Sequence, residues 1–114
     1  MNFSFEITDR KKYCVISLAG SLIEKNQAAE MMDEINTLLA HDVNYFVLDL
    51  EDLMFMNSNG ITILLGVLTK ARKAGGDLVI LNIPEKMISV FSFLKLSEVF
   101  TVVEHETDVL PMIV

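Results

Sequence analysis

The chain has 114 residues, of which 52% are hydrophobic, and a formal net charge of −7. This length is enough for one substantial core, so residues 1–114 are predicted to form a single domain. The acidic balance argues against nucleic acid and anionic membrane surfaces as partners, because both attract basic faces. A protein partner with a basic rim suits the charge better.

The apolar segments argue against membrane insertion and export. The longest nearly apolar run, Ile61–Leu68, is far shorter than the ~20 residues that cross a bilayer. The first residues lack the basic start and apolar stretch of a signal peptide. The single cysteine, Cys14, lies in a strand-like segment and has no cysteine partner, which predicts an inert core thiol in a reducing compartment. A cytoplasmic location is therefore expected.

Two hydrophobic periodicities alternate along the chain. Apolar residues two apart, or in short continuous runs, predict strands, and apolar residues three to four apart predict helices. The predicted strands cover residues 3–7, 13–18, 45–50, 78–81 and 100–103, and the predicted helices cover residues 26–40, 59–74, 84–94 and 107–114.

Capping residues support several of these boundaries. Asn26 is the predicted N-cap of the first helix, and Gly75-Gly76 supply a left-handed end to the second. Pro84 suits the first turn of the third helix, whose inward residues are predicted to be Met87, Ile88, Phe91 and Leu94.

The order of these elements predicts the fold class. A hairpin followed by alternating helices and strands indicates an α/β domain with a small, mixed, mostly parallel sheet of four to five strands, flanked by about four helices. The high hydrophobic content suggests that this sheet is covered on both faces. Such sheets carry their sites at the carboxyl ends of central strands.

The segment Phe55–Gly60 falls at one such junction. After the strand over 45–50, residues 51–54 are expected to leave the sheet, and Asn57, Ser58 and Asn59 then interrupt the apolar pattern before the next helix. One interpretation is a helix cap with a turn, where Gly60 relieves crowding. The other is a phosphoacceptor, because a helix N-terminus carries a partial positive charge that tolerates a phosphate on a serine hydroxyl.

The helix that follows carries a glycine in its middle. Gly66 lies on a predicted outer stripe with Thr62, and a glycine at such a position costs about 1 kcal/mol relative to alanine. Either tight packing against the sheet or close approach of another chain explains it. Met54 and Met56 near the loop are interpreted mostly as core residues, although an exposed pair would suit an adaptable docking surface.

Catalytic and metal sites find little support. His41 and His105 have no metal-ligand spacing to other histidines or to Cys14. Ser58 lacks the preceding glycine of a hydrolase elbow, and Gly75-Gly76 lack the lysine of a phosphate loop. No catalytic residue, metal or cofactor is predicted, and the chain is not expected to be an enzyme.

Four segments together resemble a known family. They are Asp49–Leu53 followed by Phe55–Gly60, the helix with Gly66 and its Gly75-Gly76 end, Gly20 at the second strand, and Leu94–Ser97 before the last strand. The pattern is similar to the STAS domain, specifically the bacterial anti-sigma factor antagonists. The resemblance spans nearly the whole chain and implies the small mixed sheet described above.

The resemblance also implies a function. Ser58 occupies the position at which an anti-sigma factor serine/threonine kinase phosphorylates members of the family and a PP2C-type phosphatase removes the phosphate. The unphosphorylated form binds the kinase and frees a sigma factor or another effector. Partner docking is then expected through the Ser58 loop and the outer face of the next helix, namely Met56, Asn57, Ser58, Asn59, Gly60, Thr62 and Gly66.

The chain departs from the family beside Ser58. Asn57 and Ile23 stand where acidic residues are usual, which removes negative charge around the hydroxyl. A second hypothesis is therefore a STAS module that is never phosphorylated and serves as an interaction subunit of a transport or signalling complex.

Overall fold

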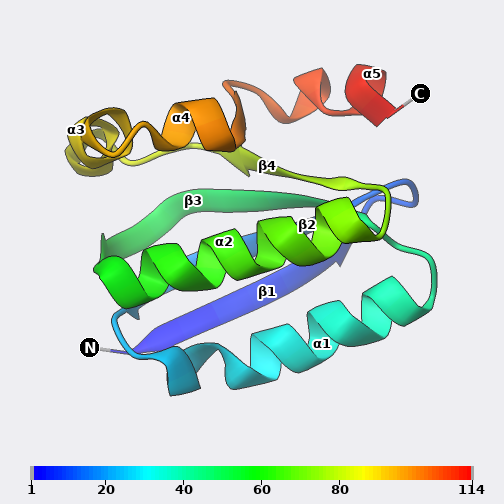
Figure 1. Cartoon of the computed structure of the whole chain (residues 1–114), viewed down its shortest axis with the longest axis horizontal. Helices are drawn as coiled ribbons and strands as arrows, with labels where there is room; N and C mark the ends of the chain where they lie inside the picture. Colours follow the sequence, from blue (N-terminus) through cyan, green and yellow to red (C-terminus); the bar gives the residue numbers. More distant parts are fainter. Residues whose placement is uncertain (1, 114) are drawn as a thin grey trace.

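A five-stranded sheet forms the centre of the computed structural model, which describes residues 2–113 (Figure 1). The strands lie in the order β1-β2-β3-β4-β5; β1 is antiparallel to β2, and the other three pairs are parallel. This confirms the predicted mixed, mostly parallel α/β sheet. The strands are β1 (Phe3–Asp9), β2 (Cys14–Leu22), β3 (Tyr45–Met56), β4 (Asp77–Leu81) and β5 (Thr101–Val103).

The crossover helices pack on one face of the sheet. Because the strands follow one another in sequence order, right-handed crossovers place every connecting helix on the same side. Buried residues of α1, α2, α3 and α4 accordingly share one core cluster with Ile16, Leu48 and Ile80 of the strands. The helical elements are η1 (Lys25–Ala28), α1 (Ala29–Ala40), α2 (Ser58–Lys73), α3 (Glu85–Phe93), α4 (Leu96–Val99), η2 (Glu106–Asp108) and α5 (Leu110–Ile113).

The opposite face of the sheet is covered by the C-terminal segment. Val15, Val47 and Val79 point to this side because successive strand residues alternate between faces, and Val109 packs on them with Ile113 beside it. The prediction that both faces are covered therefore holds for this part of the central strands. The cover on this side is two short turns, in place of the predicted continuous helix over 107–114, whose last residue lies outside the described residues.

The end of the central strand was predicted wrongly. Residues 51–54 do not leave the sheet, because β3 continues to Met56 and stays paired with β2. The register shifts twice along this pairing, and each shift inserts an extra residue in β3. These bulges break the two-residue alternation, leaving Glu51 and Asp52 exposed in succession, and so the segment has the composition of a turn.

Three predictions about helices also need correction. Asn26 is not the N-cap, because the first helical element is a 3-10 turn that begins at Lys25, and Gln27 Oε1 accepts the N–H of Glu24 at 3.0 Å. Met87 and Phe91 of α3 are buried as predicted, but Ile88 and Leu94 are 53% and 47% exposed. The third helix is amphipathic over a narrower stripe than its composition suggested.

The glycine pair after α2 behaves as predicted. Gly75 has a φ of 87°, and its N–H donates to Arg72 O at 3.0 Å, while the N–H of Gly76 donates to Ala71 O at 2.9 Å. This is the left-handed helix end that glycine favours. A side chain at Gly76 would overlap the backbone of Asn44, so the helix also needs glycine to approach β3.

The cysteine lies in the core as predicted. Cys14 is 3% exposed, and burial raises the pKa of its thiol, with the nearby Asp9 carboxylate adding to the effect. A raised pKa keeps the sulfur as an unreactive thiol at neutral pH.

A candidate phosphoacceptor and docking site at the start of α2

Asn57 follows the last residue of β3 and caps α2. Its backbone is extended, and its Oδ1 accepts the N–H groups of Asn59 at 3.0 Å and Gly60 at 3.3 Å. These donors have no acceptor within a helix, so the side chain satisfies what the first turn would otherwise leave open. The interpretation of this segment as a helix cap is confirmed.

The same turn is tied to the loop after β2. Nδ2 of Asn57 and Nδ2 of Asn59 both donate to Ile23 O, at 3.1 Å and 3.0 Å, and the N–H of Asn57 lies 3.4 Å from Leu22 O. Two asparagines therefore converge on one carbonyl. The loop at residue 23 and the start of α2 form one rigid unit.

Gly60 allows this unit to be compact. It is buried, and a Cβ there would overlap the Met56 side chain and come within 2.8 Å of Leu22 O. The residue thus presents no side-chain surface to a partner. Its role within the predicted docking set is to let α2 approach the ends of β2 and β3.

Ser58 is the first residue of α2 and is exposed. Its carbonyl accepts the hydroxyl of Thr62 at 3.0 Å, and within residues 2–113 its own hydroxyl has no hydrogen-bond partner. A hydroxyl that is accessible and unpaired at a helix N-terminus can accept a phosphoryl group, and the helix dipole favours the added charge.

The other predicted contact residues surround this serine. Asn57, Asn59 and Met56 are half-buried, whereas Thr62 is exposed one turn further along α2. Gly66, a further turn on, is half-buried, and a Cβ there would meet no atom within 4 Å. Packing against the sheet therefore does not explain Gly66, and the approach of another chain stays a prediction.

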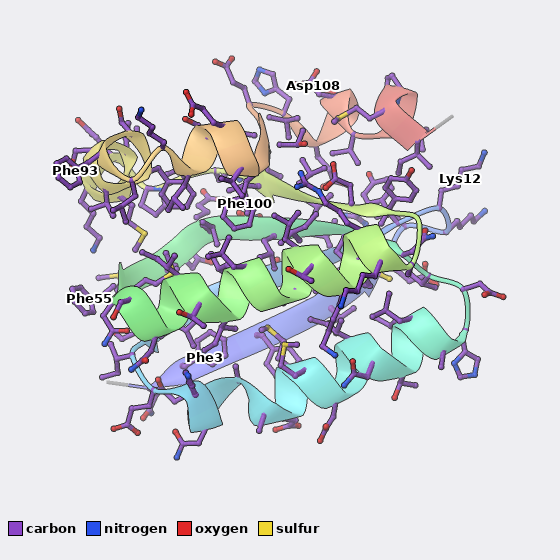
Figure 2. All side chains as sticks on the ribbon, in the orientation of Figure 1. Phe3, Lys12, Phe55, Phe93, Phe100 and Asp108 are labelled. Carbon is purple, nitrogen blue, oxygen red and sulfur yellow. The ribbon has the colours of Figure 1, made fainter. Side chains whose placement is uncertain are left out.

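An apolar groove adjoins the Ser58 turn. It is lined by the end of β3 and by α3, and both Met54 and Phe55 are about half exposed, at 51% and 53%. Figure 2 shows Phe55 at the same end of the molecule as the first turn of α2. The groove residues are Met54, Phe55, Met56, Lys86, Met87 and Val90. Of these, Phe55, Lys86, Met87 and Val90 were not predicted at the site, because residues 51–54 were expected to leave the sheet and the sequence pattern does not indicate that α3 lies beside the end of β3.

The described residues contain neither a metal site nor a membrane-spanning helix. No group of three or more His, Cys, Asp or Glu side chains in residues 2–113 is placed to hold a metal ion. No helix in the same range has both the length and the apolar composition that crossing a bilayer requires.

Comparison with known proteins identifies the family. The family model of the STAS domain matches residues 4–109. A curated relative from Paenibacillus polymyxa, named anti-sigma F factor antagonist, is 20% identical over 110 residues, covering 96% of this chain and 94% of its own.

Solved structures give the same fold. SpoIIAA, described as an anti-sigma factor antagonist, superposes in its unphosphorylated form with a TM-score of 0.72 at 22% identity, covering 92% of each chain. The phosphorylated form of the Bacillus cell fate determinant SpoIIAA superposes with a TM-score of 0.73 at 23% identity, covering 96% of this chain and 99% of its own. With the family model covering nearly the whole described chain, this protein belongs to the STAS domain family.

Proposed function

We propose that this protein is an anti-sigma factor antagonist that works by partner switching. In its unphosphorylated form it binds a serine/threonine kinase that acts as an anti-sigma factor, and phosphorylation of Ser58 releases it. A PP2C-type phosphatase restores the binding form. The protein acts in the cytoplasm as a single domain, as a substrate and switch without catalysis of its own.

The observation that carries this proposal is the exposure of Ser58 on a rigid turn. A kinase can reach the exposed hydroxyl, and the bonds from Asn57 and Asn59 to Ile23 O fix the turn that presents it. The relative from Paenibacillus polymyxa supports the role through its name, and SpoIIAA supports the modification, since it is known in both forms.

The electrostatic basis of the switch is a difference between two environments. In the free protein the phosphate is solvated and faces the positive end of α2. At a docked interface the same phosphate, with a charge of about −1.5 to −2, loses water and gains no matching cation. Each ~1.4 kcal/mol of that penalty lowers affinity tenfold.

Docking is proposed to use the surface around Ser58, where exposed and half-buried residues lie together. This surface includes Asn57, Asn59, Met56 and Thr62, the strip of α2 at Gly66, and the neighbouring groove with Phe55 and Val90. Because a Cβ at Gly66 meets nothing within its own chain, a flat helix surface there would let a partner approach closely.

The test is a kinase reaction followed by capture. The protein is incubated with the serine-kinase anti-sigma factor of its source organism and ATP, and mass spectrometry locates the phosphate. We expect one phosphate on Ser58 and none on Ser58→Ala. In a pull-down with the same kinase, Ser58→Ala is expected to bind like the wild type and Ser58→Asp at least about tenfold more weakly. Equal capture of both variants would contradict the charge switch.

A further inference from the structure

The open edge of the sheet at β1 lies beside a groove that the proposed function does not use. β1 is the first strand in the sheet order, so within the described residues 2–113 it pairs with β2 alone. Between β1 and α1 lies a groove of about 390 Å³, and a second hollow of about 190 Å³ shares Ile7 and Glu34 with it. The groove residues are Phe3, Ser4, Phe5, Ile7, Gln27, Glu30 and Glu34.

The backbone of β1 offers regular donors and acceptors to this groove. The N–H of Arg10 donates to Tyr13 O, and the N–H of Ser21 donates to Asn2 O. Bonding in an antiparallel pair alternates along the strand, so the even-numbered residues of β1 bond to β2. Phe3, Phe5 and Ile7 therefore point their N–H and C=O groups outward, away from the sheet.

The side chains of these three residues form an apolar floor. All three are half-buried and pack against the core on the helix side. The rings of Phe3 and Phe5 are stacked, with centroids 6.5 Å apart, and Figure 2 shows Phe3 beside the start of the first helix. A half-exposed aromatic pair is a favourable surface for the planar guanidinium of arginine.

The opposite wall of the groove is acidic. Glu30 and Glu34 lie one turn apart on α1, and both are exposed. Neither forms an ion pair with any residue of the described range 2–113. A ligand that places cations opposite these carboxylates would form favourable charge pairs with them, because no existing ion pair has to be broken first.

We propose that this groove binds an extended segment of a partner protein with Arg or Lys at every second position, which adds to β1 as a sixth strand. Strand addition pairs the outward groups of Phe3, Phe5 and Ile7 with the backbone of the segment. In antiparallel pairing, the residues directly opposite these three direct their side chains to the same face. The aliphatic stems of the arginine or lysine side chains then lie on the apolar floor, and their charged ends reach Glu30 and Glu34.

A second copy of this chain is a poorer occupant of the same edge. Two-fold pairing through β1 would bring the acidic walls of two copies together, and within residues 2–113 no basic side chain lines the groove to compensate. Each copy also carries a formal net charge of −7. Like charges across an interface oppose association.

The probe for this proposal is the peptide Ser-Arg-Val-Arg-Val-Arg-Ser, acetylated and amidated at its ends. We expect binding that slows amide exchange at Phe3, Phe5 and Ile7 about tenfold or more, while Ser4, Glu6 and Thr8, already bonded to β2, change little. N-methylation of the arginine amides, which point at β1, should abolish binding. N-methylation of the valine amides, which point away, should leave it intact.

Protein variants test the acidic wall. The double variant Glu30→Gln and Glu34→Gln should bind the peptide about fivefold to tenfold more weakly, since two charge pairs are lost. Its control, Glu85→Gln with Glu98→Gln, has the same net charge and should change affinity less than about twofold. Thermal unfolding of both variants checks that they remain folded.

Several results would overturn the proposal. They are no binding of the peptide, binding that survives methylation of the arginine amides, equal affinity of the two double variants, and a dimer that forms through β1 without peptide. Ser58→Asp should bind the peptide as the wild type does, so a failure at this groove is distinguishable from a failure of the Ser58 switch.

Discussion

At the scale of single residues, asparagine at position 57 has two different bonding roles. Its Oδ1 accepts two N–H groups of α2, and its Nδ2 donates to Ile23 O. An aspartate at this position would keep the cap but has no N–H to donate. Asparagine at position 57 therefore adds a link between the β2 loop and α2, and asparagine at position 59 adds a second link to the same carbonyl.

Asn57→Ala should lower the free energy of unfolding by about 1–2 kcal/mol, because it removes a helix cap together with the bond to Ile23. Asn57→Asp should lose less, since its carboxylate still caps α2. Chemical denaturation measures both changes, and Asn36→Ala on the exposed side of α1 is the control for the loss of an asparagine. A cost for Asn57→Ala no larger than that of Asn36→Ala would show that the cap contributes nothing.

Much of this residue-scale picture was predictable. Small polar residues between a strand and a helix predict a cap, and the position of Ser58 at the helix start follows from the same pattern. The bonds to Ile23 were not predictable, because they join residues 34 and 36 positions apart in the chain. The exposure of Phe55 was also missed, since it depends on bulges that the composition of residues 51–54 conceals.

At the scale of elements, α2 contains two glycines with opposite roles. Gly60 is enclosed by Met56 and Leu22 O, whereas Gly66 faces open space. Gly60 lies in the first turn of α2 and Gly66 in its middle, where the cost of glycine relative to alanine applies in full.

Gly66→Ala should raise the free energy of unfolding by about 0.5–1 kcal/mol, because alanine favours the helix and its methyl group meets no other atom. Gly60→Ala should lower it by about 1–3 kcal/mol, because Met56 and the β2 end must shift. The two variants are matched controls for one another in the same denaturation experiment. Destabilisation by Gly66→Ala would mean that the surface of α2 is more crowded than the structure shows.

The C-terminal segment is anchored by a small polar cluster. Glu106 Oε2 accepts the Tyr13 hydroxyl at 2.8 Å and Nε–H of Arg10 at 2.9 Å. The bond from Tyr13 lowers the pKa of the Glu106 carboxyl, with burial opposing and Arg10 assisting, while burial and then Glu106 raise the pKa of Tyr13. The anchor holds η2 where Val109 can cover the far face of the sheet.

This anchor should give a pH-dependent contribution to stability. A carboxyl whose pKa is lowered by folding stabilises the protein above its unfolded pKa of about 4.3 and loses that contribution as pH falls through the folded pKa. Glu106→Gln should therefore cost up to about 1 kcal/mol at pH 7, since the pair is partly exposed, and less at pH 3, which lies below the unfolded pKa. Unfolding is compared at both pH values, with Glu104→Gln as control, and an equal cost at both would contradict the assignment.

At the scale of the whole molecule, the two faces of the sheet are covered in different ways. The crossover helices form the core on one face, and a short C-terminal segment completes the other. The alternation of strands and helices predicted a mixed, mostly parallel sheet with helices packed against it, but not which face each helix covers. Which residues remain exposed, such as Ile88 and Leu94 of α3, depends on the packing of whole elements and could not be predicted from periodicity.

The Ser58 turn lies on the surface, outside the hydrophobic core on which α2 packs. Ser58 is exposed, whereas Gly60 and Leu64 of the same helix are buried, so a charge added at the surface does not need to enter the packed interior. The domain is expected to keep its fold when Ser58 is phosphorylated. The modification is expected to change the affinity for a partner that docks at this turn.

The most direct test is to prepare the protein with phosphoserine at position 58 and to measure both its stability and its affinity for the kinase partner. The account predicts a free energy of unfolding within about 1 kcal/mol of the unmodified protein, since the helix end accepts the charge, and an affinity at least about tenfold lower. Unchanged affinity, or a phosphorylated protein that no longer folds, would contradict it.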